Sequence, residues 1–539
     1  MNRFGEVIGG LLLAIMAARS GLPAPPGGQE SVSPQVVEHF RAGQQDLRSG
    51  RPNEAVEQFQ AVVRLAPALS EARINLGLAY HLLGKYRLAA TELEKGLKQN
   101  PNVLGGNIIL GLDELRLGAA AKAVPPLRRA AQLDPSNLQA WSSLAAAYLA
   151  LGHYLEASQA YRAAFGKKPT AENWLHLGHA YLQMSSQLTA RMGHEYGNTG
   201  WAKRLAGDLL SERQLWSDAA QRYRLALARD PAQPGLHSSL ANALLKQGST
   251  AEAKAEFRKE AKIDETQRPG WSACQAHHYD ACVQYLETRR QLNRAHLVAL
   301  GDAQFALGRY PEASDAFATV WAQGQRDPET LYWLIRSYSK IADGCFSRLA
   351  ASYPNSAQAH ALEAESYRAR GEDDKAVTEY LLASALQPEN ASLHEALGEL
   401  YLDKHQLSEA QNELRKALEL DPARARALYL MGRLEIGQQK PQSAIPYLEK
   451  ALSYDPQLLE ARASLGLAYL RAGKPALAVP QFQRSISLDY YGDLHYMLYQ
   501  AYRELGNRDL AESALSTSQA LRRKTQSRDQ ALIRSAESQ

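Results

Sequence analysis

The chain has 539 residues, of which 45% are hydrophobic, 22% are charged and 8% are aromatic, and its formal net charge at pH 7 is +4. So small a net charge on so long a chain excludes a global electrostatic field that would attract nucleic acid or an anionic membrane. The chain contains only three cysteines, which excludes a fold held together mainly by disulfides.

The N-terminal segment has the pattern of a secretory signal peptide. Arg3 precedes an apolar run from Val7 to Ala18, and a Pro/Gly-rich stretch follows Gly21. The run is about a dozen residues long, whereas a helix that spans a bilayer needs roughly 20. We therefore expect a signal peptide over 1–20, a linker over 21–35, and a mature protein that is exported to the periplasm or the extracellular space without stable membrane insertion. The alternative is a cytoplasmic protein that keeps Met1.

A constant 34-residue step organises the next part of the chain, 36–267. Prolines follow this step at Pro67, Pro101, Pro135 and Pro169, and glycines follow it at Gly43, Gly77 and Gly111. Within one step, two runs of apolar residues spaced three and four apart are separated by a glycine, which predicts two helices joined by a turn. A fixed period of this length predicts a solenoid in which each unit buries its apolar face against its neighbours.

Two units, near residues 171 and 328, are shorter than the rest. The spans from Tyr181 to Ser185 and from Tyr338 to Ala342 cover four residues, where a full unit, as from Tyr80 to Ala89, takes nine. The two short spans lie 157 residues apart. When the sequence is aligned with itself at this offset, the two spans coincide and many other residues match. This repeated defect favours duplication of a block of several units, and two independent deletions are the alternative.

An irregular connector is expected at 268–293, and it contains Cys274 and Cys282 with two histidines between them. Three interpretations are open. We rank two ordinary buried thiols first, a disulfide between Cys274 and Cys282 second, and a zinc site third, because no recognised spacing of metal ligands is present. We expect no metal and no cofactor.

The 34-residue step returns in the second array, 294–525. Prolines follow it at Pro354, Pro388, Pro422 and Pro456, and glycines follow it at Gly398, Gly432 and Gly466. A polar tail covers 526–539. The basic stretch Arg522-Arg523-Lys524 has no interleaved aromatic residues, so it predicts a solvated last helix rather than a nucleic-acid site.

The units resemble the tetratricopeptide repeat family. The residues that carry the resemblance in one unit are Trp141, Leu144, Tyr148, Gly152, Tyr154, Ala157, Tyr161 and Pro169. The resemblance implies an all-α fold, a right-handed α-solenoid with irregular units in the middle, whose first helices line a groove that binds segments of partner proteins.

The resemblance also implies which residues line this groove. They are the fifth and ninth residues of each unit: Ile74, Leu78, Ile108 and Leu112 in the first array, and Glu395, Glu399, Tyr429 and Arg433 in the second. For the apolar residues, packing between neighbouring first helices is the alternative to ligand contact. Sequence motifs of zinc proteases, serine hydrolases, P-loop proteins and dinucleotide-binding enzymes are absent. We therefore expect a non-catalytic protein-interaction scaffold. An accessory or adaptor subunit that presents substrates to a separate envelope enzyme or secretion machine is the alternative.

Overall fold

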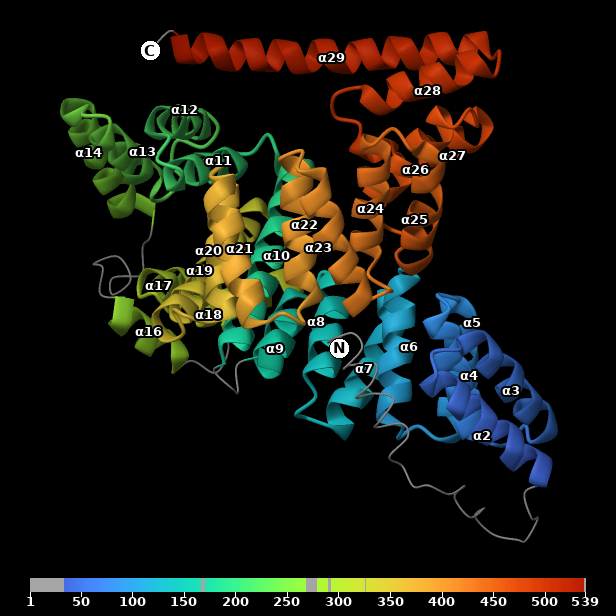
Figure 1. Ribbon diagram of the computed structural model, residues 1–539. Coiled ribbons are helices and arrows are strands. Elements are labelled where there is room, and N and C mark those ends of the chain that lie inside the picture. The colour runs from blue at the N-terminus through green and yellow to red at the C-terminus, as the bar shows by residue number, and fades with distance from the viewer. Residues whose placement is uncertain (1–32, 166–169, 268–278, 289–291, 325, 538–539) are drawn as a thin grey trace. The chain divides into compact units, whose positions relative to one another are not determined.

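The computed structural model of the protein describes residues 33–165, 170–267, 279–288, 292–324 and 326–537. Within these ranges it contains helices and no strand, as the sequence predicts (Figure 1). The predicted signal peptide and most of the predicted linker and connector lie outside the described residues. No helix in the described part of the chain is both long enough and apolar enough to cross a membrane.

The helices follow one another with short turns between them. The first are α2 (Pro34–Arg48), α3 (Pro52–Leu65), α4 (Ser70–Leu82), α5 (Tyr86–Gln99), α6 (Leu104–Arg116) and α7 (Ala120–Leu133). Next come α8 (Leu138–Ala150), α9 (Tyr154–Phe165), α10 (Ala171–Tyr196), α11 (Gly200–Glu212), α12 (Trp216–Leu227), α13 (Leu236–Lys246), α14 (Thr250–Gln267), α16 (Tyr279–Glu287), α17 (Arg294–Ala306), α18 (Tyr310–Ala322) and α19 (Pro328–Ser352). The last are α20 (Ala357–Ala369), α21 (Asp373–Leu386), α22 (Ala391–Asp403), α23 (Leu407–Leu420), α24 (Ala425–Gly437), α25 (Pro441–Tyr454), α26 (Leu459–Arg471), α27 (Pro475–Arg484), a 3₁₀ turn (Ile486–Leu488), α28 (Asp493–Glu504) and α29 (Arg508–Glu537).

Each regular unit is a hairpin of two helices, and in many of the units a glycine in the first helix allows the second helix to approach closely. A Cβ atom added at Gly77 would lie 2.5 Å from Cγ of Leu93, and one added at Gly432 would lie 2.5 Å from Cγ of Leu448. Carbon atoms in contact normally stay about 3.5–4.0 Å apart, so a larger residue would push the two helices apart. The glycine steps in the sequence therefore mark the contacts within the hairpins.

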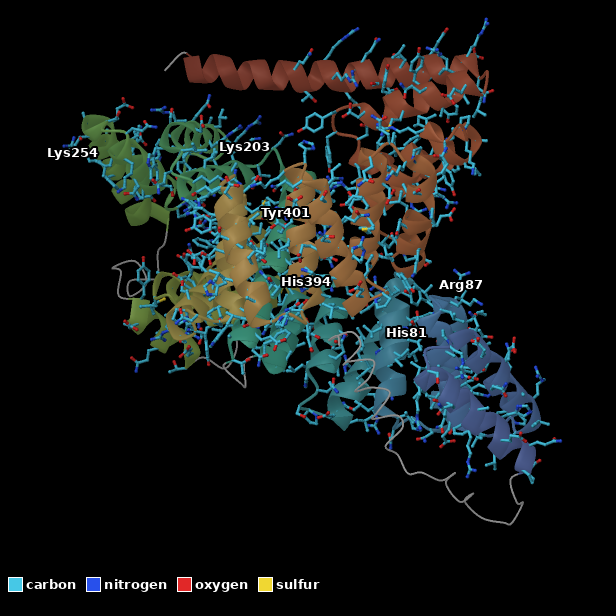
Figure 2. The ribbon with its side chains drawn as sticks, viewed as in Figure 1. His81, Arg87, Lys203, Lys254, His394 and Tyr401 are labelled. Atoms are coloured by element: carbon cyan, nitrogen blue, oxygen red, sulfur yellow. The ribbon has the colours of Figure 1, made fainter. Side chains whose placement is uncertain are left out.

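The prolines of the 34-residue step that the structure describes lie in the turns between units. Pro388 follows α21, and its carbonyl oxygen is hydrogen-bonded at 2.9 Å to Nε2 of His394, six residues later (Figure 2). Arg462 donates to the carbonyl oxygen of Pro456 at 2.7 Å across the same six-residue interval. The side chain six positions after the proline thus ties the first helix of a unit to the turn that precedes it.

Each of the two shortened units forms one continuous helix. Helices α10 and α19 have 26 and 25 residues, whereas α2 and α27, which belong to regular hairpins, have 15 and 10. A helix without a turn cannot fold back over its own apolar face. Gly178 of α10 therefore packs against Phe346 of α19, where an added Cβ atom would lie 2.8 Å from Cδ1 and 2.9 Å from Cζ of the ring.

Helices α10 and α19 cover each other in antiparallel orientation at equivalent positions of the two blocks. The rings of Tyr181 and Tyr338, which match across the shift between the blocks, lie 5.6 Å apart, and both side chains are fully buried. On one side of this pair, the hydroxyl of Ser185 donates to the carbonyl oxygen of Ile335 at 3.2 Å.

The helices that precede this pair repeat the relationship. Helices α9 and α18 are equivalent under the same shift, and Arg162 of α9 donates to Asp315 of α18 at 2.7 Å. Two equivalent helix pairs in mutual contact define an approximate two-fold axis between the blocks. This arrangement supports duplication rather than two independent deletions.

By compactness the chain divides into two units. The middle unit contains residues 134–354, and the terminal unit contains the residues up to Leu133 together with those from Asn355. This division does not follow the predicted arrays, 36–267 and 294–525, because α10 and α19 belong to different arrays and pack on each other. The six tryptophans that the structure describes all lie in the middle unit.

Candidate functional site

The predicted groove residues of the first array are mostly covered by their own neighbours. Ile74 and Leu78 of α4 are each 2% exposed, Ile108 of α6 is fully buried, and Leu112 is half-buried. Ile74 packs on Gly96 of α5, where an added Cβ atom would lie 2.7 Å from Cγ1 of the isoleucine. Packing within the array therefore uses the apolar surface of α4, and ligand contact by these residues stays a prediction.

The predicted groove residues of the second array form a ladder of ion pairs between successive first helices. Glu399 of α22 binds Arg368 of α20 at 3.2 Å and Arg426 of α24 at 2.6 Å. Burial alone would raise the pKa of Glu399, but its two arginine partners outweigh burial and hold the pKa below the usual value. The carboxylate is therefore charged and already paired.

The other members of this set are paired in the same way. Glu395 is bound by Arg424 at 2.6 Å, and Arg433 lies 3.4 Å from Asp403 and 5.9 Å from the ring of Tyr429. These side chains come from α22, from α24 and from the turn that precedes α24. A ladder whose charges are paired internally offers no unbalanced charge for a partner to neutralise.

In the middle unit, the face of α11 that carries the predicted groove positions is covered by another helix of the chain. Asp208 is the ninth residue of α11, as Leu78 is the ninth residue of α4, so the two residues occupy equivalent positions. Its Oδ2 accepts a hydrogen bond from the hydroxyl of Tyr332 of α19 at 2.6 Å, and its Oδ1 accepts one from Tyr223 of α12 at 2.8 Å. Burial raises the pKa of the Tyr332 hydroxyl, which therefore stays protonated and donates.

The contact between α11 and α19 continues one turn further along both helices. Arg336 of α19 donates to Glu212 of α11 at 2.6 Å. Burial alone would lower the pKa of Arg336, but nearby acidic groups, Asp208 foremost, hold it above the usual value. The pair is therefore an ion pair in a partly desolvated site, where attraction is stronger than at the surface.

Aromatic rings complete the same contact. Arg204, the fifth residue of the unit, is 6% exposed, and its guanidinium carbon lies 5.0 Å from the ring centre of Tyr332 and 5.4 Å from that of Trp201. A desolvated cation–π contact contributes about 2 kcal/mol. The predicted groove face of α11 thus contacts α19 through a carboxylate, a guanidinium and aromatic rings.

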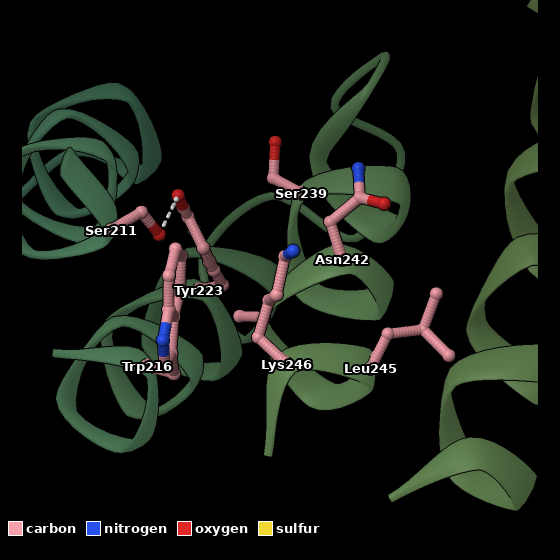
Figure 3. Close-up of a pocket in the computed structure, with 8 residues that line it drawn as sticks. Ser211, Trp216, Tyr223, Ser239, Asn242, Leu245 and Lys246 are labelled. Carbon is pink, nitrogen blue, oxygen red and sulfur yellow. Dashed lines mark hydrogen bonds between the residues drawn. The ribbon is translucent and has the colours of Figure 1, made fainter. Parts of the chain in front are cut away.

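The equivalent face of the next unit is open. Asn242 and Lys246 of α13 stand one full 34-residue step after Asp208 and Glu212, and both are exposed. They line a cavity of about 450 Å³ with Trp216 and Ser211 (Figure 3). Its other lining residues are Tyr223, Ser239, Ala243 and Leu245. A volume of this size is in the usual range for ligand sites.

The cavity adjoins the occupied face directly. The hydroxyl of Tyr223 lies 3.0 Å from the hydroxyl of Ser211 in the cavity wall, and it also donates to Asp208. The rule that selected Ile74 and Leu78 also selects Arg204, Asp208 and Asn242 when it is applied to the units near 200 and 234. The sequence prediction did not include them because it covered only units in the two regular stretches of the chain, and α11 and α13 lie between these stretches.

The cysteines fall partly outside the described residues. Cys274 is not described, so its predicted pairing with Cys282 stays a prediction, and Cys282 on α16 is fully buried. Cys345 is a free thiol in the core, and burial raises its pKa to about 11, which keeps it protonated at neutral pH. Within the described residues, no three His, Cys, Asp or Glu side chains are grouped to hold a metal ion.

Comparisons with known proteins agree with the repeat assignment. Models described as tetratricopeptide repeat match residues 40–103, 109–183, 204–267 and 429–492, and also 391–424, and a model described as TPR repeat matches 364–404. A comparison with curated proteins gives no match.

The chain is similar to several solved structures of other proteins, three of which are described here. MamA is 25% identical, with 30% of this chain and 96% of that chain covered and a TM-score of 0.28. YrrB, described as a TPR protein with an unusual peptide-binding site, is 23% identical, with coverages of 33% and 91% and a TM-score of 0.28. The Cut9–Hcn1 hetero-tetramer of the APC/C is 15% identical, with coverages of 90% and 94% and a TM-score of 0.31. The repeat models together match more than half of this sequence, and the chain belongs to the tetratricopeptide repeat family.

Proposed function

We propose that the protein is a non-catalytic scaffold that binds segments of partner proteins on the groove faces of its first helices. The observation that carries the proposal is the contact between α11 and α19. There, the groove positions of one unit hold a helix from a distant part of the chain through Asp208, Glu212 and Arg204. A face that binds one helix of the chain itself has the chemistry to bind a helix of another protein.

The cavity on α13 is the part of this surface that is free for a partner. Its polar side chains Asn242 and Lys246 are exposed, whereas Glu212 of α11 and Glu399 of α22 are engaged with arginines of the chain itself. Binding at the cavity therefore needs no existing ion pair to break, which favours it over the paired ladder.

The scaffold acts outside the cytoplasm in this proposal. The support is the pattern of 1–20, in which a basic residue is followed by an apolar run too short to span a bilayer. Presentation of substrates to a separate envelope enzyme or secretion machine would be one use of such a scaffold. N-terminal sequencing of the mature protein tests the location, because an exported protein lacks Met1 and a cytoplasmic one keeps it.

Affinity purification from the cells that make the protein tests the binding function. The full chain is compared with Ser239→Trp, which fills the cavity, and with Gln221→Trp, which places the same ring on the exposed side of α12. We expect a partner protein that the wild type and Gln221→Trp retain and that Ser239→Trp loses, with unchanged circular dichroism. Equal recovery by all three chains would contradict binding at this site.

A further inference from the structure

The two blocks of the middle unit are joined by contacts between residues that are far apart in the sequence. The first block contains α9, α10 and α11, and the second contains α18 and α19. Arg162 and Asp315 are 153 residues apart, and Asp208 and Tyr332 are 124 residues apart. Such contacts need the two faces but no particular chain segment between them, so the same faces can meet between two chains. We infer that they also fit a second copy of this chain, with the first block of each copy on the second block of the other.

The charges at this contact select which blocks pair. At the 157-residue offset, the equivalents of Arg162 and Asp315 are Thr319 and Ser158, which are uncharged and whose hydroxyls already have partners. Two first blocks in the same arrangement would place Arg162 opposite Ser158, and two second blocks would place Asp315 opposite Thr319. The charged side chains are 31% and 35% exposed, and each would then lose its partner in a partly desolvated place. The ion pair therefore favours a first block on a second block.

Packing between α10 and α19 selects the same pairing by size. Phe346 lies on Gly178, and the equivalents of these residues are Thr189 and Ile335. Two second blocks would bring Phe346 against Ile335, which overfills the contact. Two first blocks would bring Gly178 against Thr189, which leaves space unfilled. Both cost stability, so a second copy fits through its unlike block.

The covalent link between the blocks decides which copy supplies the partner. The blocks follow each other in the sequence and are joined through the predicted connector, 268–293. This link raises the effective concentration of the chain's own second block, so the pairing within one chain is favoured. Charges that repel within one chain and attract between two chains would reverse that preference, because every other contact is the same in both arrangements.

Two charge-reversed variants of the full chain test the inference. Arg162→Asp leaves two carboxylates at the contact, and Asp315→Arg leaves two guanidinium groups, so each variant repels its own second block. When the two variants are mixed in urea and refolded together, exchange of the second blocks restores an ion pair at both contacts. We expect about tenfold more dimer in this mixture than in either variant refolded alone, measured by size-exclusion chromatography with light scattering. The excess should shrink at high salt.

Two matched chains separate the effect of charge from a general loss of stability. The chain with both Arg162→Asp and Asp315→Arg carries a reversed ion pair within itself. The chain with both Arg162→Gln and Asp315→Asn carries no charge at the contact. Neither chain gains from exchange, so both should form no more dimer than the wild type when refolded at the same concentration.

The outcomes against the inference are equally specific. No excess of dimer in the mixture, or an equal excess from the uncharged chain, would overturn it. If a charge-reversed variant fails to fold alone, circular dichroism of the mixture replaces the comparison, and a helical signal no larger than the mean of the separate variants would overturn the inference too. The proposed scaffold function does not enter this test, because no partner protein is present.

Discussion

Replacement of Gly178 by alanine tests how the two shortened units are covered. Alanine in a helix interior is more favourable than glycine by about 1 kcal/mol. The new Cβ atom would, however, lie 2.8 Å from Cδ1 and 2.9 Å from Cζ of Phe346, well inside normal contact, and overpacking of this kind costs about 1–3 kcal/mol. Gly193, in the same helix, has no atom within 4 Å of an added Cβ, so Gly193→Ala gains the helix preference alone.

The helix preference of alanine contributes equally to the unfolding free energies of the two variants. The difference between these free energies therefore reports the contact between α10 and α19 alone. We expect Gly178→Ala to be less stable than Gly193→Ala by about 2 kcal/mol. Urea denaturation followed by tryptophan fluorescence measures this difference, because every tryptophan among the described residues lies in the middle unit. Phe346→Leu should recover part of the loss in the Gly178→Ala background. Equal stabilisation by both alanines would refute the packing of α19 on Gly178.

Three further predictions concern single side chains. A hydrogen bond with Glu413 raises the pKa of His394 in the folded state. The contribution of this pair to stability is therefore complete below about pH 6.5 and is lost as the pH rises through the folded-state pKa. His394→Gln should remove this pH dependence from the melting temperature measured by circular dichroism. Ile74→Glu should lower the melting temperature strongly, because it buries a charge. Leu88→Glu, at a side chain that is 50% exposed, should change the melting temperature little. Equal effects of the two substitutions would refute the packing of Ile74. Tyr332→Phe removes a hydrogen bond to the α11 carboxylate and should cost about 1.5–3 kcal/mol in urea denaturation followed by tryptophan fluorescence, whereas no change would refute that contact.

The regular part of the fold could be predicted from the sequence because its causes are local. The glycine steps predict the hairpin contacts, since the glycine and its partner, as Gly77 and Leu93, belong to the two helices of one unit. The short span after Tyr181 predicts a broken hairpin for the same reason. What covers the broken hairpin could not be predicted, because Gly178 and Phe346 come from different blocks.

In the candidate site, too, contacts between residues that are far apart in the sequence could not be predicted. The spacing rule that yields Ile74 also yields Asp208 and Asn242, so the positions themselves could be read from the sequence. The spacing alone does not predict that α19 covers Asp208 and leaves Asn242 exposed, because Asp208 and its partner Tyr332 are 124 residues apart in the sequence. Nor could it separate packing from binding at Ile74, since both need the same apolar side chain.

Photo-cross-linking in the cells that make the protein tests most directly whether partners bind on the open groove face. A photoreactive phenylalanine analogue replaces Leu245, which lines the cavity and is 43% exposed, or Leu225, which is 44% exposed on α12 and does not line it. We expect the analogue at position 245 to capture a partner protein that the analogue at position 225 does not capture. Capture of the same proteins from both positions, or of none from position 245, would contradict it.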